Sequence, residues 1–214
     1  MGKNQSSMDN RLRLGVLLSG SGRTLVNILN HISDGLLKAE VAVVVASRPC
    51  RGIDLARDAG LDAHLVPYKQ MPDVQTYSDQ ITAILERSDV DMVAMAGFLS
   101  TWLIPPQFVN RVMNIHPALL PAFGGPGMYG HHVHEAVLNH GCRVSGCTVH
   151  FVTNEYDRGP IIVQRCVPVL EADTPDSLAD RVFQQELEAF PEALRLFAQG
   201  RLRIDGARVR ILPE

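Results

Sequence analysis

Long apolar runs and clusters of basic charge are both missing from this sequence. No apolar stretch approaches the roughly 18–20 residues that a membrane span requires. The formal net charge of the 214 residues is −3, whereas a protein that binds a nucleic-acid backbone needs a concentrated cationic face. Residues 1–10 are polar and lack the apolar core of a signal peptide. These absences predict a cytoplasmic protein that binds neither a membrane nor a nucleic acid.

Closely spaced metal ligands are missing as well. The four cysteines contain no Cys-x-x-Cys pair, so we expect free thiols and no zinc. The cysteines are Cys50, Cys142, Cys147 and Cys166, and a histidine-rich region holds His131, His132, His134, His140 and His150. The first three histidines are too close in sequence to converge on one metal ion from one helix face. We expect no metal, and expect one or two of these histidines to bind an anion.

Apolar runs alternate with helical spacing through the first half of the chain. The runs predict buried strands over residues 12–18, 41–46, 63–66 and 91–96, and a shorter run ends at Met113. The helical spacing predicts helices over residues 25–32, 52–59 and 77–87. This alternation is typical of an α/β protein with a doubly wound, mostly parallel, Rossmann-like sheet.

The pattern changes after residue 120. Four glycines and one proline in residues 122–130 predict a loop, followed by a short helix over 134–138. Two apolar runs, 144–152 and 161–169, predict a C-terminal antiparallel hairpin, and residues 177–199 a long helix that Pro191 should kink or split. We expect a disordered tail over residues 1–10 and a single domain over residues 11–214.

A glycine turn, Ser19-Gly20-Ser21-Gly22, follows the first predicted strand. Such a turn lets backbone N–H groups approach a phosphate at the start of a helix, and Arg23 would add a permanent charge. Leu25 stands where a dinucleotide-binding motif has its third glycine, and no P-loop lysine is present. The turn therefore favours a single phosphate, the alternative being a plain turn without a ligand.

Asn114 and His116 lie where a buried strand should end, and Pro117 and Pro121 stiffen the chain that follows. Ligands of open α/β sheets bind at the carboxyl ends of strands, and residues two apart on a strand share a side. An amide can hydrogen-bond an oxygen that gains negative charge, and an imidazole can transfer a proton. The pair therefore suits acyl transfer, although it could also be a satisfied polar pair at a strand end.

Asp157, in Asp157-Arg158-Gly159-Pro160, has two readings. It could simply form the hairpin turn. If the turn folds back toward the sheet, its carboxylate would pair with His116 and favour the protonated imidazole. No Gly-x-Ser-x-Gly motif is present, which favours direct attack by a substrate amine over a covalent intermediate.

Four motifs together resemble the folate-dependent phosphoribosylglycinamide formyltransferase family, over about residues 12–200. They are Ser19–Gly22, Ala96–Phe98, Asn114–Pro121, and Val149–Thr153 with Asp157–Pro160. The resemblance implies a one-carbon transferase of purine biosynthesis that moves the formyl group of 10-formyltetrahydrofolate to the amine of 5'-phosphoribosylglycinamide without a metal. It implies a monomer or a homodimer whose partners are these two small molecules.

The same resemblance implies roles for individual residues. The catalytic set would be Asn114, His116 and Asp157, with His116 as general acid, Asn114 bonded to the formyl oxygen, and Asp157 holding His116 and an ordered water. The ribonucleotide would contact Gly22, Arg23, Thr24 and Glu186, and the folate Leu99, Ser100, Thr101, Trp102 and Asn114. Without the resemblance, Glu186 would be read as solvated helix surface.

The chain departs from the family pattern at three places. Arg23-Thr24 stands where many relatives have Ser-Asn, and Ser100 where many have Arg or Lys. The region around Val74 lacks an arginine that some relatives use near the folate. Arg23 would compensate by meeting the phosphate directly.

Three other functions compete with this interpretation. A 10-formyltetrahydrofolate hydrolase shares the chemistry but usually carries an extra N-terminal regulatory domain. A methionyl-tRNA formyltransferase would need a further C-terminal domain and more positive charge. A non-catalytic folate or nucleotide sensor would leave Asn114, His116 and Asp157 without a purpose.

Overall fold

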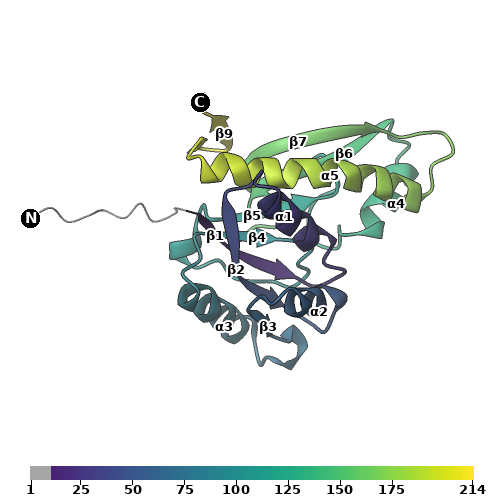
Figure 1. Ribbon diagram of the computed structural model, residues 1–214. Helices are drawn as coiled ribbons and strands as arrows, with labels where there is room; N and C mark the ends of the chain where they lie inside the picture. The colour runs from purple at the N-terminus through teal and green to yellow at the C-terminus, as the bar shows by residue number, and fades with distance from the viewer. Residues whose placement is uncertain (1–10) are drawn as a thin grey trace, which may run out of the picture.

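A nine-stranded sheet runs through the computed structural model, which describes residues 11–214 (Figure 1). The strands are β1 (Leu12–Leu18), β2 (Ala39–Ala46), β3 (Ala63–Leu65), β4 (Met92–Met95), β5 (Val112–His116), β6 (Val144–Phe151), β7 (Ile161–Pro168), β8 (Leu202–Asp205) and β9 (Arg208–Ile211). The helices are α1 (Arg23–Ser33), α2 (Arg51–Asp58), α3 (Val74–Arg87), α4 (His131–Asn139) and α5 (Pro175–Ala198). The tail predicted over residues 1–10 lies outside the described residues.

The first half of the sheet is parallel, with strand order β3-β2-β1-β4-β5. The predicted strands and helices of this half are confirmed, with ends that differ by a few residues. β1 and β4 are continuous apolar runs because both faces of a parallel sheet are covered by helices. None of the helices within residues 11–214 is long and apolar enough to cross a membrane.

The second half of the sheet contains the antiparallel hairpin that the sequence predicts, formed by β6 and β7. β5 also pairs with β6 in the antiparallel sense, and β9 and β8 extend the sheet beyond β7. The pair β8–β9 was not predicted, because each strand has only four residues and half of those residues are charged. Charged side chains on short edge strands disfavour pairing with another chain.

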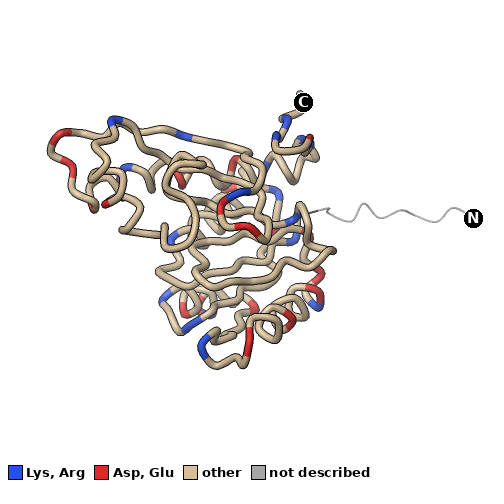
Figure 2. Tube along the Cα trace, turned by 180° about the vertical axis from the view of Figure 1, so that it is seen from behind, with Lys and Arg blue, Asp and Glu red and all other residues tan. Residues whose placement is uncertain are grey.

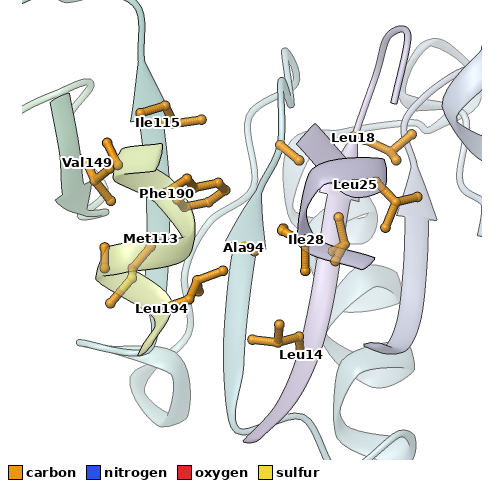
Figure 3. Close-up of a cluster of buried hydrophobic side chains, with 14 of the residues drawn as sticks. Leu14, Leu18, Leu25, Ile28, Ala94, Met113, Ile115, Val149, Phe190 and Leu194 are labelled. Atoms are coloured by element: carbon orange, nitrogen blue, oxygen red, sulfur yellow. The ribbon is translucent and has the colours of Figure 1, made fainter. Parts of the chain in front are cut away.

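Helices pack on both faces of the sheet. α1, α2, α4 and α5 bury apolar side chains against one face, and α3 does so against the other. Figure 3 shows two parts of the first layer: Phe190 and Leu194 of α5 beside Met113 and Ile115 of β5, and α1 side chains over β1. On the outside, basic and acidic residues are interspersed rather than sorted by sign (Figure 2), in keeping with the small net charge.

Pro191 does not split α5, which is continuous from Pro175 to Ala198, so this part of the prediction was wrong. A proline inside a helix leaves the carbonyl four residues earlier without its N–H donor. That carbonyl belongs to Leu187, and it accepts a hydrogen bond of 2.8 Å from Nδ2 of Asn27 on α1. The side chain of a neighbouring helix thus replaces the bond that the proline cannot make.

We predict that Asn27→Ala lowers the free energy of unfolding by about 1–2 kcal/mol, because it leaves the Leu187 carbonyl without a donor. In a Pro191→Ala background the loss should be smaller, since the substituted residue regains a backbone N–H for that carbonyl. Urea unfolding of the four proteins of this double-mutant cycle measures the difference. An equal loss in both backgrounds would show that the Asn27 bond does not compensate for the proline.

Candidate active site

The carboxyl ends of β1, β4 and β5 meet at the point where the strand order changes direction, between β1 and β4. In open α/β sheets this is where ligands bind. The turn after β1 is tied to the segment after β4 by two bonds: Ser19 N–H donates to the Gly97 carbonyl at 3.0 Å, and Ser19 Oγ accepts from Leu99 N–H at 3.0 Å. A cavity of about 430 Å³ opens along this edge.

Asn114 lies on β5 directly opposite His150 on β6. His150 Nδ1 is 2.8 Å from the Phe151 carbonyl, so Nδ1 carries the proton. Nε2 is then the acceptor, and it receives a hydrogen bond of 3.3 Å from Nδ2 of Asn114. Burial lowers the pKa of His150, so the ring remains a neutral acceptor. The Asn114 amide is thereby held in one orientation, with its second N–H left for a ligand.

His116 is 4% exposed and lines the same cavity. Its Nε2 is 2.8 Å from the carbonyl of Phe123, so this nitrogen donates to the glycine-rich segment 122–130. Its Nδ1 lies 3.7 Å from Oδ2 of Asp157, which is longer than a direct hydrogen bond. The other oxygen, Oδ1, is 3.7 Å from Nε2 of His150. Asp157 therefore sits between the two imidazole rings.

The turn after β6 aims Asp157 at these rings. Asp157 adopts a left-handed backbone with φ of 52°, which aspartate tolerates better than most residues. A Cβ on Gly159 would lie 1.7 Å from the Phe151 carbonyl, so only glycine allows the chain to turn so close to the strand. Gly125 N–H donates to Oδ2 of Asp157 at 2.8 Å. Asp157 therefore forms the turn, and the turn folds back so that its carboxylate also faces His116.

The segment that follows His116 is held by hydrogen bonds to Thr148, whose side chain is fully buried. Its hydroxyl donates to the Ala118 carbonyl at 2.7 Å and accepts from Leu120 N–H at 3.0 Å. Gln164 Nε2 donates both to this hydroxyl, at 3.0 Å, and to the Leu120 carbonyl, at 2.9 Å. These bonds satisfy the buried polar groups and hold the segment that carries His116 in place.

The other end of the cavity is formed by the start of α1 and one face of α5. Gly22 has φ of 78° and is the N-cap of α1, with no side chain to cap the helix and no acidic residue in the first turn. Arg23 and Thr24 line the cavity. The Arg23 guanidinium carbon lies 3.6 Å from the centre of the Phe183 ring on α5. This end of the cavity therefore presents a cation and helical N–H groups.

Glu186 lines the cavity one helical turn after Phe183 and is partly buried. Burial raises the pKa of its carboxyl group to about 7, although the nearby positive charge of Arg23 acts in the opposite direction. The reading of Glu186 as solvated helix surface was wrong, because α5 packs against the sheet and Glu186 faces the cavity.

The segment Leu99–Trp102 lines a third side of the cavity. Leu103 N–H donates to Ser78 Oγ at 2.9 Å, which holds the segment at its end. Thr101 Oγ1 is 2.8 Å from the hydroxyl of Tyr156, on the loop after β6. Trp102 is 4% exposed and its Nε1 donates to Thr82 Oγ1 at 3.2 Å, so most of the indole lies in the core.

The structure brings together every residue that the sequence analysis assigned to the site except Gly22. This glycine does not line the cavity; a Cβ there would lie 2.7 Å from Gly52 Cα, so Gly22 shapes the turn. The places of His150, Phe183 and Phe123 in the site were not predicted from the sequence. A histidine within the apolar run 144–152 was the one available signal for His150, whereas the other two depend on contacts between distant segments.

His131 and His134 of α4 line the cavity, and anion binding by one or two of the histidines stays a prediction. His131 lies 3.3 Å from Asp176 and 3.5 Å from Glu135, so it faces carboxylates. His134 lines the cavity, but burial lowers its pKa to about 4 and the ring stays neutral. No group of three or more His, Cys, Asp or Glu side chains within residues 11–214 is arranged to hold a metal ion, and all four cysteines are free.

Comparisons with known proteins agree with this geometry. A profile of the formyl transferase family matches residues 12–194. The chain is 39% identical to the chloroplastic phosphoribosylglycinamide formyltransferase of Arabidopsis thaliana, over 90% of this chain and 68% of that protein. It is 33% identical to the phosphoribosylglycinamide formyltransferase of Escherichia coli (strain K12), over 90% of each chain.

Longer proteins also contain a similar segment. The chain spans 20% of the trifunctional purine biosynthetic protein adenosine-3 of Gallus gallus, with 35% identity. Among solved structures, glycinamide ribonucleotide transformylase 1 from Symbiobacterium toebii superposes with a TM-score of 0.90, at 42% identity over 99% of both chains.

The raised pKa of Glu186 predicts a pH-dependent stability. Between about pH 4.5 and pH 7 the folded chain holds a proton that the unfolded chain releases, so this carboxyl stabilises the fold fully only below that range. Glu186→Gln should therefore gain stability relative to the unmodified protein as the pH rises from 5 to 8, by about 1–3 kcal/mol. Denaturant unfolding at several pH values measures this difference, with Glu188→Gln, at an exposed position of the same helix, as the control. The same pH dependence for both variants would contradict the assignment to Glu186.

Proposed function

The chain belongs to the formyl transferase family, and from this premise we propose that it transfers the formyl group of 10-formyltetrahydrofolate to the amine of 5'-phosphoribosylglycinamide. Its relatives of this name, at 33–39% identity over most of the chain, support the activity. The observation that carries the proposal is the placement of the Asn114 amide and the His116 imidazole in one cavity, with the cation Arg23 at its other end.

The reaction requires two kinds of help from the protein. The amine nitrogen attacks the formyl carbon, a new C–N bond forms, and negative charge develops on the formyl oxygen. The tetrahedral species then collapses, the bond from carbon to N10 of the folate breaks, and N10 gains a proton while the attacking nitrogen loses one. A donor for the oxygen and a group that transfers protons are therefore needed.

Asn114 suits the first task. One of its N–H groups is committed to His150, which fixes the amide plane, and the second is available to the formyl oxygen. A donor that is held in place before the reaction costs no reorganisation when charge develops. His150 would thus act through Asn114, as a positioning residue.

His116 suits the second task as general acid. In this structure its Nε2 proton is directed to the Phe123 carbonyl, so delivery of that proton requires a substrate atom to take the place of this carbonyl. Phe123 belongs to the glycine-rich segment 122–130, where glycines leave the backbone its widest conformational freedom. Asp157 faces Nδ1 of His116 and would orient the ring, with an ordered water bridging the 3.7 Å separation.

The ends of the cavity suit the two substrates. We assign the phosphate of the ribonucleotide to the turn at Gly22, Arg23 and Thr24, and its ribose to Glu186. We assign the folate to Leu99–Trp102 and Asn114, where Ser100 and Thr101 supply polar groups without charge. A cytoplasmic location, and a monomer or homodimer as the working form, stay predictions.

One assay tests the proposed function. The protein is incubated with 10-formyltetrahydrofolate in the presence and in the absence of 5'-phosphoribosylglycinamide, and the released tetrahydrofolate is measured. We expect turnover only with the ribonucleotide. Equal turnover without it would identify a hydrolase, and tight folate binding without any turnover would identify a sensor.

His116→Ala should lower kcat by about 10²–10⁴-fold, the usual contribution of general acid–base catalysis. The substrate affinities should change little, because the ring acts on the transferred group. Steady-state kinetics with both substrates measure the effect, and His64→Ala, at a half-exposed position on β3, is the control. A loss below about tenfold would remove His116 from proton transfer.

A further inference from the structure

Phe183 has no task in the proposed reaction, yet its ring lies against the one permanent cation of the cavity lining within the described residues. It stands on α5 one turn before Glu186, so both side chains project from the same face of the helix. The guanidinium carbon of Arg23 is 3.6 Å from the ring centre, well within the range of a cation–π contact.

This contact leaves the hydrogen-bonding capacity of Arg23 available. The donors of a guanidinium lie in its plane, so a ring against its flat face blocks none of them. Among the described residues, Arg23 contacts the Phe183 ring and makes no side-chain hydrogen bond or ion pair, while its charge acts on the nearby Glu186 carboxyl group. An exposed arginine would otherwise sample many rotamers, and the ring restricts this freedom before a ligand arrives.

The start of α1 borders the same cavity as these donors. Arg23 is the first residue of the helix, after the left-handed Gly22, and the first turn contains no acidic side chain. Arg23 and Thr24 both line the cavity, so one ligand there can meet the helix start and the guanidinium together. A phosphate dianion is the part of the proposed ribonucleotide whose charge and shape match this arrangement.

We propose that Phe183 is a positioning residue for phosphate recognition, holding the guanidinium of Arg23 beside the start of α1. The inference rests on the proposed function and deepens it, because it assigns substrate affinity to a residue that acts through Arg23. A lysine at position 23 would not substitute, since a compact ammonium group has no flat face to stack and no fork of donors.

The test compares the kinetics of Phe183→Leu with those of the unmodified protein. We expect KM for 5'-phosphoribosylglycinamide to rise about three- to tenfold, in line with the usual strength of a cation–π contact. The values of kcat and of KM for the folate should stay within twofold, because the phosphate is remote from the reacting atoms. Phe183→Tyr, which keeps the aromatic face, should restore KM. Phe197→Leu, farther along α5 and outside the cavity lining, controls for loss of an aromatic ring from the helix.

A double-mutant cycle separates this role from a structural one. Arg23→Ala alone should raise the same KM at least as much as Phe183→Leu, and Phe183→Leu should add less than twofold to Arg23→Ala. Full additivity of the two substitutions would overturn the proposal, as would an unchanged KM in Phe183→Leu or a matching fall in kcat.

Binding of ribose 5-phosphate, measured by calorimetry, reports on the same pair without turnover. We expect Phe183→Leu to weaken it by a similar factor in the presence of Arg23 and by less than twofold in its absence. Absence of transferase activity in the unmodified protein would refute the proposed function. A transferase in which Phe183→Leu leaves both KM and ribose 5-phosphate binding unchanged would refute this inference alone.

Discussion

The side-chain hydrogen bond from Asn114 to His150 joins two adjacent strands of the sheet, and the geometry of the site depends on it. The two residues are direct partners of the antiparallel pair β5–β6. A shift of β6 by one residue along β5 would turn His150 to the opposite face of the sheet, away from Asn114, because side chains alternate along a strand. The bond also requires one tautomer of His150, which the Phe151 carbonyl selects. Strand register and proton position thus determine together where the amide donor points.

Burial of side chains controls which groups in the cavity carry a charge. Burial keeps His134 and His150 neutral and raises the pKa of Glu186 to about 7. Arg23 is the one arginine or lysine of the described lining, so it supplies the permanent positive charge that an anionic ligand meets there. Under the proposed function, this asymmetry would orient the substrate with its phosphate toward α1 and its amine toward His116.

The sequence predicted those features that depend on neighbouring residues. The apolar runs of β1, β2 and β4, the glycine turn and the polar strand end at Asn114 and His116 are all local patterns. Asp157 could be foreseen as a partner of His116 because a turn that returns to the strand ends is common in hairpins. The burial of Glu186, the contact of Phe183 with Arg23, and the bond from Asn27 to Leu187 were not foreseeable in this way. Each joins α1 or the strand edge to α5, which is distant in sequence, and no local pattern encodes that packing.

The bond between Asn27 and Leu187 has a consequence for ligand affinity. Asn27 lies one turn after Arg23 on α1, and Leu187 follows Glu186 on α5. The two helices that carry Arg23 and Phe183 are therefore joined to each other by the carbonyl that Pro191 leaves without a backbone donor. The carbonyl left free in one helix becomes a contact between the two helices. A substitution at position 191, which lies outside the cavity lining, would therefore change the affinity of the protein for the proposed ribonucleotide.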